Sequence, residues 1–184
     1  QGNTGSKNIA IGYTAMESYT TGEDNVAIGR NALGDVTTGD NNIAIGEGAL
    51  STTDVAASDN IMMGYFAGAA LKGGFNIGIG SNAVNGSITT SNNTGTQNVG
   101  IGHFTLSEIT SGDNNVAIGN TALQNVSSGN GNIGIGQDAG DSITDGSFNV
   151  LIGEDAGQDI TSGDDNLIIH AGDNSANAPL STTA

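Results

Sequence analysis

Two histidines and several adjacent pairs of carboxylates are the residues that could support catalysis or bind a metal in this chain. The histidines are His103 and His170, and the acidic pairs are Glu23-Asp24, Glu154-Asp155 and Asp164-Asp165. Carboxylate pairs can act as acid and base in hydrolysis, and their oxygens are suitable ligands for Ca²⁺. No nucleophile motif, phosphate-binding loop or zinc-ligand spacing accompanies them. We therefore predict a protein without enzymatic activity and without a cofactor.

Calcium binding stays open as an alternative, because acidic residues recur at similar intervals along the chain. The glycine-rich nonapeptide of calcium-binding β-rolls is not present, however. Acidic residues in turns are also expected simply because they are well solvated there.

The composition restricts the partners and the class of fold. The 184 residues include 31 Gly and no Cys, with 19 acidic residues against 3 basic ones and a formal net charge of −16. Such a charge repels phosphate, so we expect no nucleic acid partner, and no apolar run is long enough for insertion into a membrane. The absence of cysteine excludes disulfides and thiolate metal sites. The length fits one domain.

A repeat in the sequence determines the positions of all these residues. Subtracting neighbouring numbers gives spacings of 17, 17, 18, 16, 22, 17, 17, 17 and 17 for ten asparagines, each followed by an aliphatic residue. We number every unit from its asparagine, which is position 1. The ten asparagines are Asn8, Asn25, Asn42, Asn60, Asn76, Asn98, Asn115, Asn132, Asn149 and Asn166.

The unit predicts one coil of a parallel β-solenoid. Aliphatic residues at positions 2 and 4, such as Val116 and Ile118, alternate with smaller ones and end at a Gly, which is a strand signal. We expect positions 2 and 4 to face the core and a second short strand to pass through Ala122, Leu123 and Val126. The chain is then an all-β, parallel β-roll of about ten 17-residue coils, roughly 45–50 Å long, with the asparagines stacked in a ladder.

Position 3 carries no charged or polar residue in any of the ten units, although a solvent-facing strand position should be polar in some. We predict that this stripe of small apolar residues is the interface between chains of an oligomer. A second apolar layer within the same chain is the alternative. The ten residues are Ala10, Ala27, Ala44, Met62, Gly78, Gly100, Ala117, Gly134, Leu151 and Ile168.

The repeat resembles a known family through its N-[V/I]-A-I-G core, found at Asn25–Gly29, Asn42–Gly46 and Asn115–Gly119. It is similar to the YadA-like head of trimeric autotransporter adhesins, and to related repeats in phage and bacterial fibres, often upstream of an intramolecular chaperone domain. The resemblance spans Asn8 to Ile169, although the adhesin heads use a shorter repeat. It implies a left-handed β-roll and a homotrimer, located extracellularly on a bacterial surface or a phage virion.

The repeat also divides the chain. We expect residues 1–169 to form the β-roll, and residues 170–184 to lead out of it towards a further region. His170 stands where the other units have their fixed Gly, and the repeat fades after it.

The predicted function is adhesion to a cell-surface glycan, a protein receptor or a matrix. Aromatic residues just after the fixed Gly are suited to stacking on sugar rings or peptide side chains, and the longest unit, Asn76 to Gln97, predicts a protruding polar loop. A purely structural spacer is the alternative. The candidate ligand-binding residues are Tyr13, Arg30, Tyr65, Phe66, His103 and Phe104 at the coil corners, and Ser87, Asn92 and Asn93 in the loop.

Ice binding is a further alternative, suggested by Thr and Ser at positions 13 and 14 in several units. Examples are Thr110-Ser111, Ser127-Ser128 and Thr161-Ser162. The column is interrupted by Ala56-Ala57 and Asp145, whereas a surface that matches an ice lattice should be regular.

Overall fold

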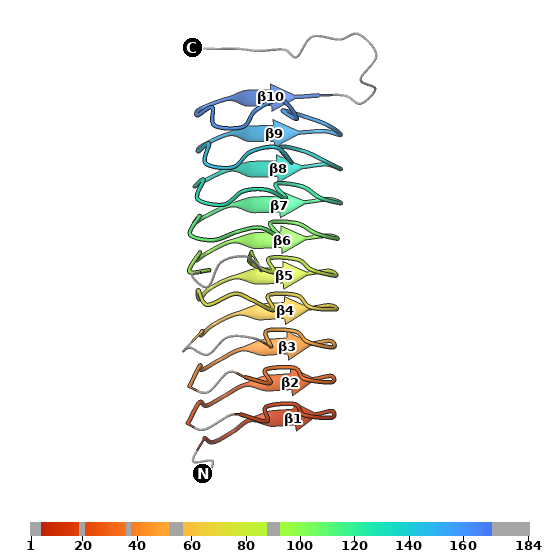
Figure 1. The fold of residues 1–184 in the computed structure, drawn as a ribbon, viewed down its shortest axis with the longest axis vertical. Helices are drawn as coiled ribbons and strands as arrows, with labels where there is room; N and C mark the ends of the chain where they lie inside the picture. Colours follow the sequence, from red (N-terminus) through yellow and green to blue (C-terminus); the bar gives the residue numbers. More distant parts are fainter. Residues whose placement is uncertain (1–4, 19–20, 36–37, 52–56, 88–92, 171–184) are drawn as a thin grey trace.

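A computed structural model describes residues 5–18, 21–35, 38–51, 57–87 and 93–170. Ten strands of three residues form one parallel sheet in chain order, stacked along the long axis (Figure 1). The prediction of an all-β, parallel β-solenoid is confirmed. The strands are β1 (Ile9–Ile11), β2 (Val26–Ile28), β3 (Ile43–Ile45), β4 (Ile61–Met63), β5 (Ile77–Ile79), β6 (Val99–Ile101), β7 (Val116–Ile118), β8 (Ile133–Ile135), β9 (Val150–Ile152) and β10 (Leu167–Ile169).

Neighbouring strands pair at identical positions of the unit. Ile9 is opposite Val26 in the first pair, and the same register holds between Ile77 and Val99, on either side of the 22-residue unit. The extra residues of that unit therefore leave the strands in line. Each unit is one rung of the solenoid, and equal positions of successive rungs form columns that run the length of the roll.

The asparagine at position 1 forms the predicted ladder inside the roll. Asn115 Oδ1 accepts the backbone N–H of Asn132 at 2.9 Å and its side-chain amide at 3.0 Å. The Asn115 amide donates in turn to Asn98 Oδ1 at 3.1 Å and to the Gly129 carbonyl at 2.9 Å. All three asparagines are fully buried. A buried amide that hydrogen-bonds to the rungs above and below and to its own rung fixes where each rung begins.

The predicted orientation of the strands is wrong: position 3 faces the core of the single chain, and positions 2 and 4 face outward. Ala27, Ala44 and Ala117 are fully buried within this one chain. The predicted interface stripe is therefore the inner layer in the inner rungs, and only its end residues, Ala10 and Ile168, are exposed or half-buried. This correction covers Ala10, Ala27, Ala44, Met62, Gly78, Gly100, Ala117, Gly134, Leu151 and Ile168.

The reason for the reversal is that the interior of each coil is narrow. A Cβ added to Gly134 would lie 2.7 Å from Leu123 Cγ and 2.9 Å from the Ala139 carbonyl oxygen. Where position 3 is large, as at Leu151, a glycine takes up the opposite place, and a Cβ on Gly157 would lie 2.7 Å from Leu151 Cδ2. Large β-branched residues at positions 2 and 4 do not fit this space, so they point out.

No second strand is present in the described part of each unit. Ala122 and Leu123 lie in a turn instead, and Leu123 has a φ of 50°. The fixed glycine at position 5 closes the strand before that turn. Gly119 has a φ of 136°, and a Cβ there would lie 2.4 Å from the Gly136 carbonyl oxygen of the next rung. Successive backbones therefore approach too closely at this corner for any other residue.

We predict that Asn115→Ala lowers the free energy of unfolding by at least about 2 kcal/mol, because it leaves buried donors of Asn132 and the buried Gly129 carbonyl without partners. Urea unfolding monitored by circular dichroism measures the change. The matched control is Asn120→Ala in the same rung, where an exposed amide is removed and the change should stay within about 0.5 kcal/mol. Equal effects of the two variants would contradict a stabilising ladder.

Candidate functional site

The outer surface of the sheet is the most distinctive surface of the described chain. The side chains at positions 2 and 4 point outward on all ten strands and are aliphatic throughout, with Ile11, Ile43, Met63, Ile101 and Ile118 between 36% and 58% exposed. We call these twenty side chains, two per strand, the apolar face. An outward sheet surface in contact with water is normally polar, so this surface is typical of an interface.

Two columns border the apolar face. The strand-start column contains the residue directly before each asparagine, and the strand-end column contains the residue directly after the fixed Gly. The strand-start column is Lys7, Asp24, Asn41, Asp59, Phe75, Gln97, Asn114, Gly131, Phe148 and Asp165. The strand-end column is Tyr13, Arg30, Glu47, Tyr65, Ser81, His103, Asn120, Gln137 and Glu154.

The strand-end column carries the predicted aromatic residues. Tyr13 is 78% exposed and Tyr65 is 53% exposed. Tyr65 contacts Phe66 edge to face with ring centroids 4.5 Å apart, and His103 contacts Phe104 in the same way at 4.3 Å. The structure therefore brings these candidates together as two pairs on separate rungs, with Tyr13 at a distance from both.

The inner members of the pairs are less accessible than the sequence suggested. Phe66 and Phe104 are half-buried. The Phe66 ring covers Gly48 on the preceding rung, where an added Cβ would lie 2.7 Å from Phe66 Cε1. Phe66 thus supports Tyr65, and the accessible aromatic surface belongs mainly to the outer member, the arrangement that a stacking platform requires.

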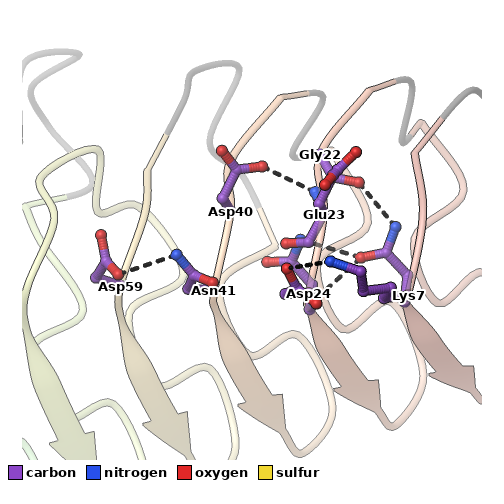
Figure 2. Close-up of polar contacts among 9 residues, drawn as sticks. Lys7, Gly22, Glu23, Asp24, Asp40, Asn41 and Asp59 are labelled. Carbon is purple, nitrogen blue, oxygen red and sulfur yellow. Dashed lines mark hydrogen bonds and ion pairs between the residues drawn. The ribbon is translucent and has the colours of Figure 1, made fainter.

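Arg30 is already paired within the chain. Its guanidinium donates to Glu47 of the next rung, and this hydrogen bond together with the charge of Glu47 raises the pKa of Arg30. On the strand-start side, Lys7 Nζ lies 3.4 Å from Asp24 Oδ2 (Figure 2). Both pairs are exposed, and such pairs contribute little to stability. The position of these ion pairs, on either side of the apolar face, therefore matters more for function than their contribution to the free energy of folding.

Phe75 and Phe148 are exposed aromatic residues that sequence analysis missed. They are 64% and 63% exposed and belong to the strand-start column. The backbone there is left-handed, with φ of 61° and 59°, which is unfavourable for a bulky side chain. The sequence feature that could identify them is their departure from the repeat, because most units place Asp, Asn or another polar residue directly before the asparagine.

The loop candidates are corrected in part. Ser87 is 4% exposed and Asn93 is 1% exposed, so neither is a surface residue. The Asn93 amide donates to the Ala70 carbonyl at 2.9 Å and to the Ser87 carbonyl at 3.0 Å. Asn93 therefore fastens the base of the insertion to the preceding rung, a stabilising role. Asn92 lies outside the described residues.

Several acidic residues stabilise neighbouring rungs. Asp40 Oδ1 accepts the Glu23 backbone N–H at 2.8 Å (Figure 2), and Asp164 Oδ1 accepts that of Ser147 at 2.7 Å. Burial raises the pKa of the Asp141 carboxyl, and the charge of Asp138 acts in the same direction. Within the described ranges, no three His, Cys, Asp or Glu side chains lie close enough to hold a metal ion.

The remaining candidates are separated by the stacking of the rungs. His103 follows β6 and His170 follows β10, so the histidines lie on different rungs. The position 13 hydroxyls bond along the roll, as Thr110 Oγ1 does to the Ser127 carbonyl at 2.9 Å. This contact joins neighbouring rungs, which is a structural explanation for the recurrence of Thr and Ser at position 13. Among the described residues, no helix has the length and apolarity needed to cross a bilayer.

Comparison with family models, with curated proteins and with solved structures found no match for this chain.

We predict that Asn93→Ala lowers the free energy of unfolding by about 1–3 kcal/mol, since the buried Ser87 carbonyl and the half-buried Ala70 carbonyl lose their donor. Thermal unfolding followed by circular dichroism measures it. The matched control, Gln137→Ala, removes an exposed amide side chain and should leave the midpoint unchanged. An Asn93→Ala protein that unfolds like the control would indicate that the amide does not fasten the insertion.

Proposed function

We propose that the chain is a non-enzymatic segment of a homotrimeric surface fibre, in which three left-handed rolls pack their apolar faces around a shared axis and present adhesive residues outside. The observation that carries this proposal is the apolar face. It runs uninterrupted from β1 to β10, about 45 Å at the usual strand spacing. Contiguous apolar surface on this scale marks an interaction site.

A second copy of the same chain is the partner that best fits this surface. The side chains of the apolar face are arranged in rows, one row per strand. Another copy of the chain has rows with the same spacing along its whole length. Closed rotational symmetry allows identical chains to cover one another's faces without leaving an end exposed. The number three and the left hand come from the resemblance of the repeat to the YadA-like adhesin heads.

The charge distribution supports the same arrangement. The chain has a formal net charge of −16, yet none of the twenty side chains of the apolar face is charged. Packing these faces together buries aliphatic groups and keeps the acidic groups of the rungs away from the axis. A highly acidic exterior favours solubility of a long fibre.

Adhesion is supported by the aromatic pairs of the strand-end column. Tyr65 with Phe66 and His103 with Phe104 offer ring surfaces whose outer members are exposed. Repetition on three chains would give a glycan or protein receptor several weak contacts at once, so affinity would arise by avidity. This function places the fibre outside the cell, on a bacterial surface or a phage virion. A spacer without its own ligand is the alternative role of the same rod.

We predict that the protein has three times the monomer mass in multi-angle light scattering. Replacing Ile101, Ile118 and Ile135 together by Thr should yield monomers, because Thr keeps the β-branched shape but removes apolar contact area. The matched control replaces Ser111, Ser128 and Ser162 together by Thr, away from the apolar face, and should remain trimeric. A monomeric wild-type protein at micromolar concentration would refute the proposal.

We predict that Tyr65→Ala combined with His103→Ala reduces binding of the fibre to its target cells or to a glycan array by about tenfold or more, since each change is repeated on three chains. Light scattering must show that the variant is still trimeric. The control is Ser81→Ala, in the same column but without a ring. Unchanged attachment of the double variant would favour the spacer role.

A further inference from the structure

The two columns that border the apolar face contain charges that can align neighbouring copies. Lys7 and Arg30 are two of the three basic residues in the chain, and they lie in different columns, Lys7 at strand starts and Arg30 at strand ends. The other basic residue, Lys72, belongs to neither column. Acidic residues outnumber basic ones 19 to 3. The presence of two basic residues beside the apolar face therefore indicates that charge matters at the edges of this face.

The argument rests on the proposed assembly of copies around an axis parallel to the roll. Rotation about such an axis keeps all strands running in the same sense, so the strand-start column of one copy must face the strand-end column of the next. These two columns then form a seam at the outer edge of each shared apolar contact, where the exposed rings of Tyr65 and His103 can contact the next copy on one side and stay open to the exterior on the other. The residues of the seam are those of the two columns defined above.

Closed rotational symmetry keeps all copies at the same height, so the seam can shift by one rung only through a tilt of each roll relative to the axis. The charges on the columns distinguish these alignments of the seam. When equal rungs face each other, Asp24 of one copy lies opposite Arg30 of the next, and no two like charges meet among the described residues of the columns. Asp59 then lies opposite Tyr65, whose hydroxyl can donate to a carboxylate. The equal-rung alignment therefore has a favourable ion pair and no repulsion.

A shift by one rung in one direction is unfavourable. Lys7 would then face Arg30, and Asp24 would face Glu47, so two pairs of like charges would meet. Like charges that meet at an interface cost binding free energy and suppress that alignment.

A shift in the opposite direction is also unfavourable. Asp59 would face Glu47 and Asp165 would face Glu154, which again brings two pairs of carboxylates together. Both shifted alignments therefore lose the Asp24–Arg30 pair and gain repulsion, although the apolar face itself would fit equally well in all three.

We infer that neighbouring copies meet rung to rung, and that Asp24 of one copy binds Arg30 of the next across the seam. Arg30 can hold Asp24 and its own Glu47 together, because a guanidinium has five N–H donors in a planar fork. The aliphatic columns provide the affinity of the assembly, and the seam sets its alignment.

The exposed phenylalanines support a covered seam. Phe75 and Phe148 are exposed in the isolated chain and have a left-handed backbone, which is unfavourable for a bulky side chain. In the equal-rung alignment Phe75 faces Ser81 of the next copy, whose small side chain leaves room for a ring. Burial of that ring between copies would offset the strain.

Cysteine pairs test the alignment directly, because the natural chain contains no cysteine. Asp24 and Arg30 stand at opposite ends of β2, on the order of 15–20 Å apart, whereas a disulfide requires Cα atoms within about 7 Å. A disulfide between positions 24 and 30 can therefore form only between copies. The test compares Asp24→Cys combined with Arg30→Cys, Glu47→Cys or Tyr13→Cys, which correspond to the equal-rung alignment and to the two shifts.

After mild oxidation, denaturing electrophoresis without reductant should show covalent trimers for the Asp24→Cys, Arg30→Cys protein and only monomers for the other two pairs. All three share the change at position 24, so strain at that residue is matched. Trimers by light scattering with cross-links in a shifted pair would overturn the alignment but keep the fibre proposal. A monomer by light scattering would overturn both.

Charge variants give a second readout that does not depend on cysteines. Arg30→Asp should raise the concentration at which trimers dissociate by about tenfold, and adding Asp24→Arg in the same chain should recover assembly, because opposite charges then meet again at all three seams. Lys72→Asp changes the net charge by the same amount outside the columns and is the control. Equal weakening by Arg30→Asp and Lys72→Asp, without recovery in the double variant, would overturn the pairing.

Discussion

The buried asparagine ladder is the interaction on which the rest of this structure depends. Each rung has a strand of only three residues, and one such strand cannot hold a coil in place by itself. The asparagine links its rung to both neighbours by donating to one rung and accepting from the next, as Asn115 does between Asn98 and Asn132. Because every rung begins at the same amide, which is buried in all but the first and last rungs, every later position of the unit falls into a column.

The ladder also explains why the class of fold could be predicted from the sequence. The spacing of the asparagines, the aliphatic alternation and the fixed glycine together predict parallel coils, and the 22-residue unit joins the sheet without a change of register. The direction of the side chains could not be predicted in the same way. Alternation shows only that positions 2 and 4 share one side of the strand, not which side is the core.

Side-chain volume decides that direction, and volume is a property of the whole coil. In most proteins the larger aliphatic residues of a strand lie inside, but here the coil leaves room only for alanine or glycine opposite Leu123. Met62 and Leu151 at position 3 are tolerated because glycines face them. A pairing of large with small residues across the coil was present in the sequence, but it could be recognised only once the turn carrying Leu123 was placed against the strand.

The candidate site was predictable where it followed the repeat and not where it departed from it. The exposed Tyr13 and Tyr65 lie at corners that the repeat defines, whereas the burial of Asn93 depends on how an insertion folds back on Ala70. In a structure made of equal rungs, the repeated residues supply the fold and the apolar face, and they cannot tell one rung from another. Individual departures such as Asp24, Arg30 and Phe75 are therefore the residues able to specify alignment, because only they differ between a correct assembly and one shifted by a rung.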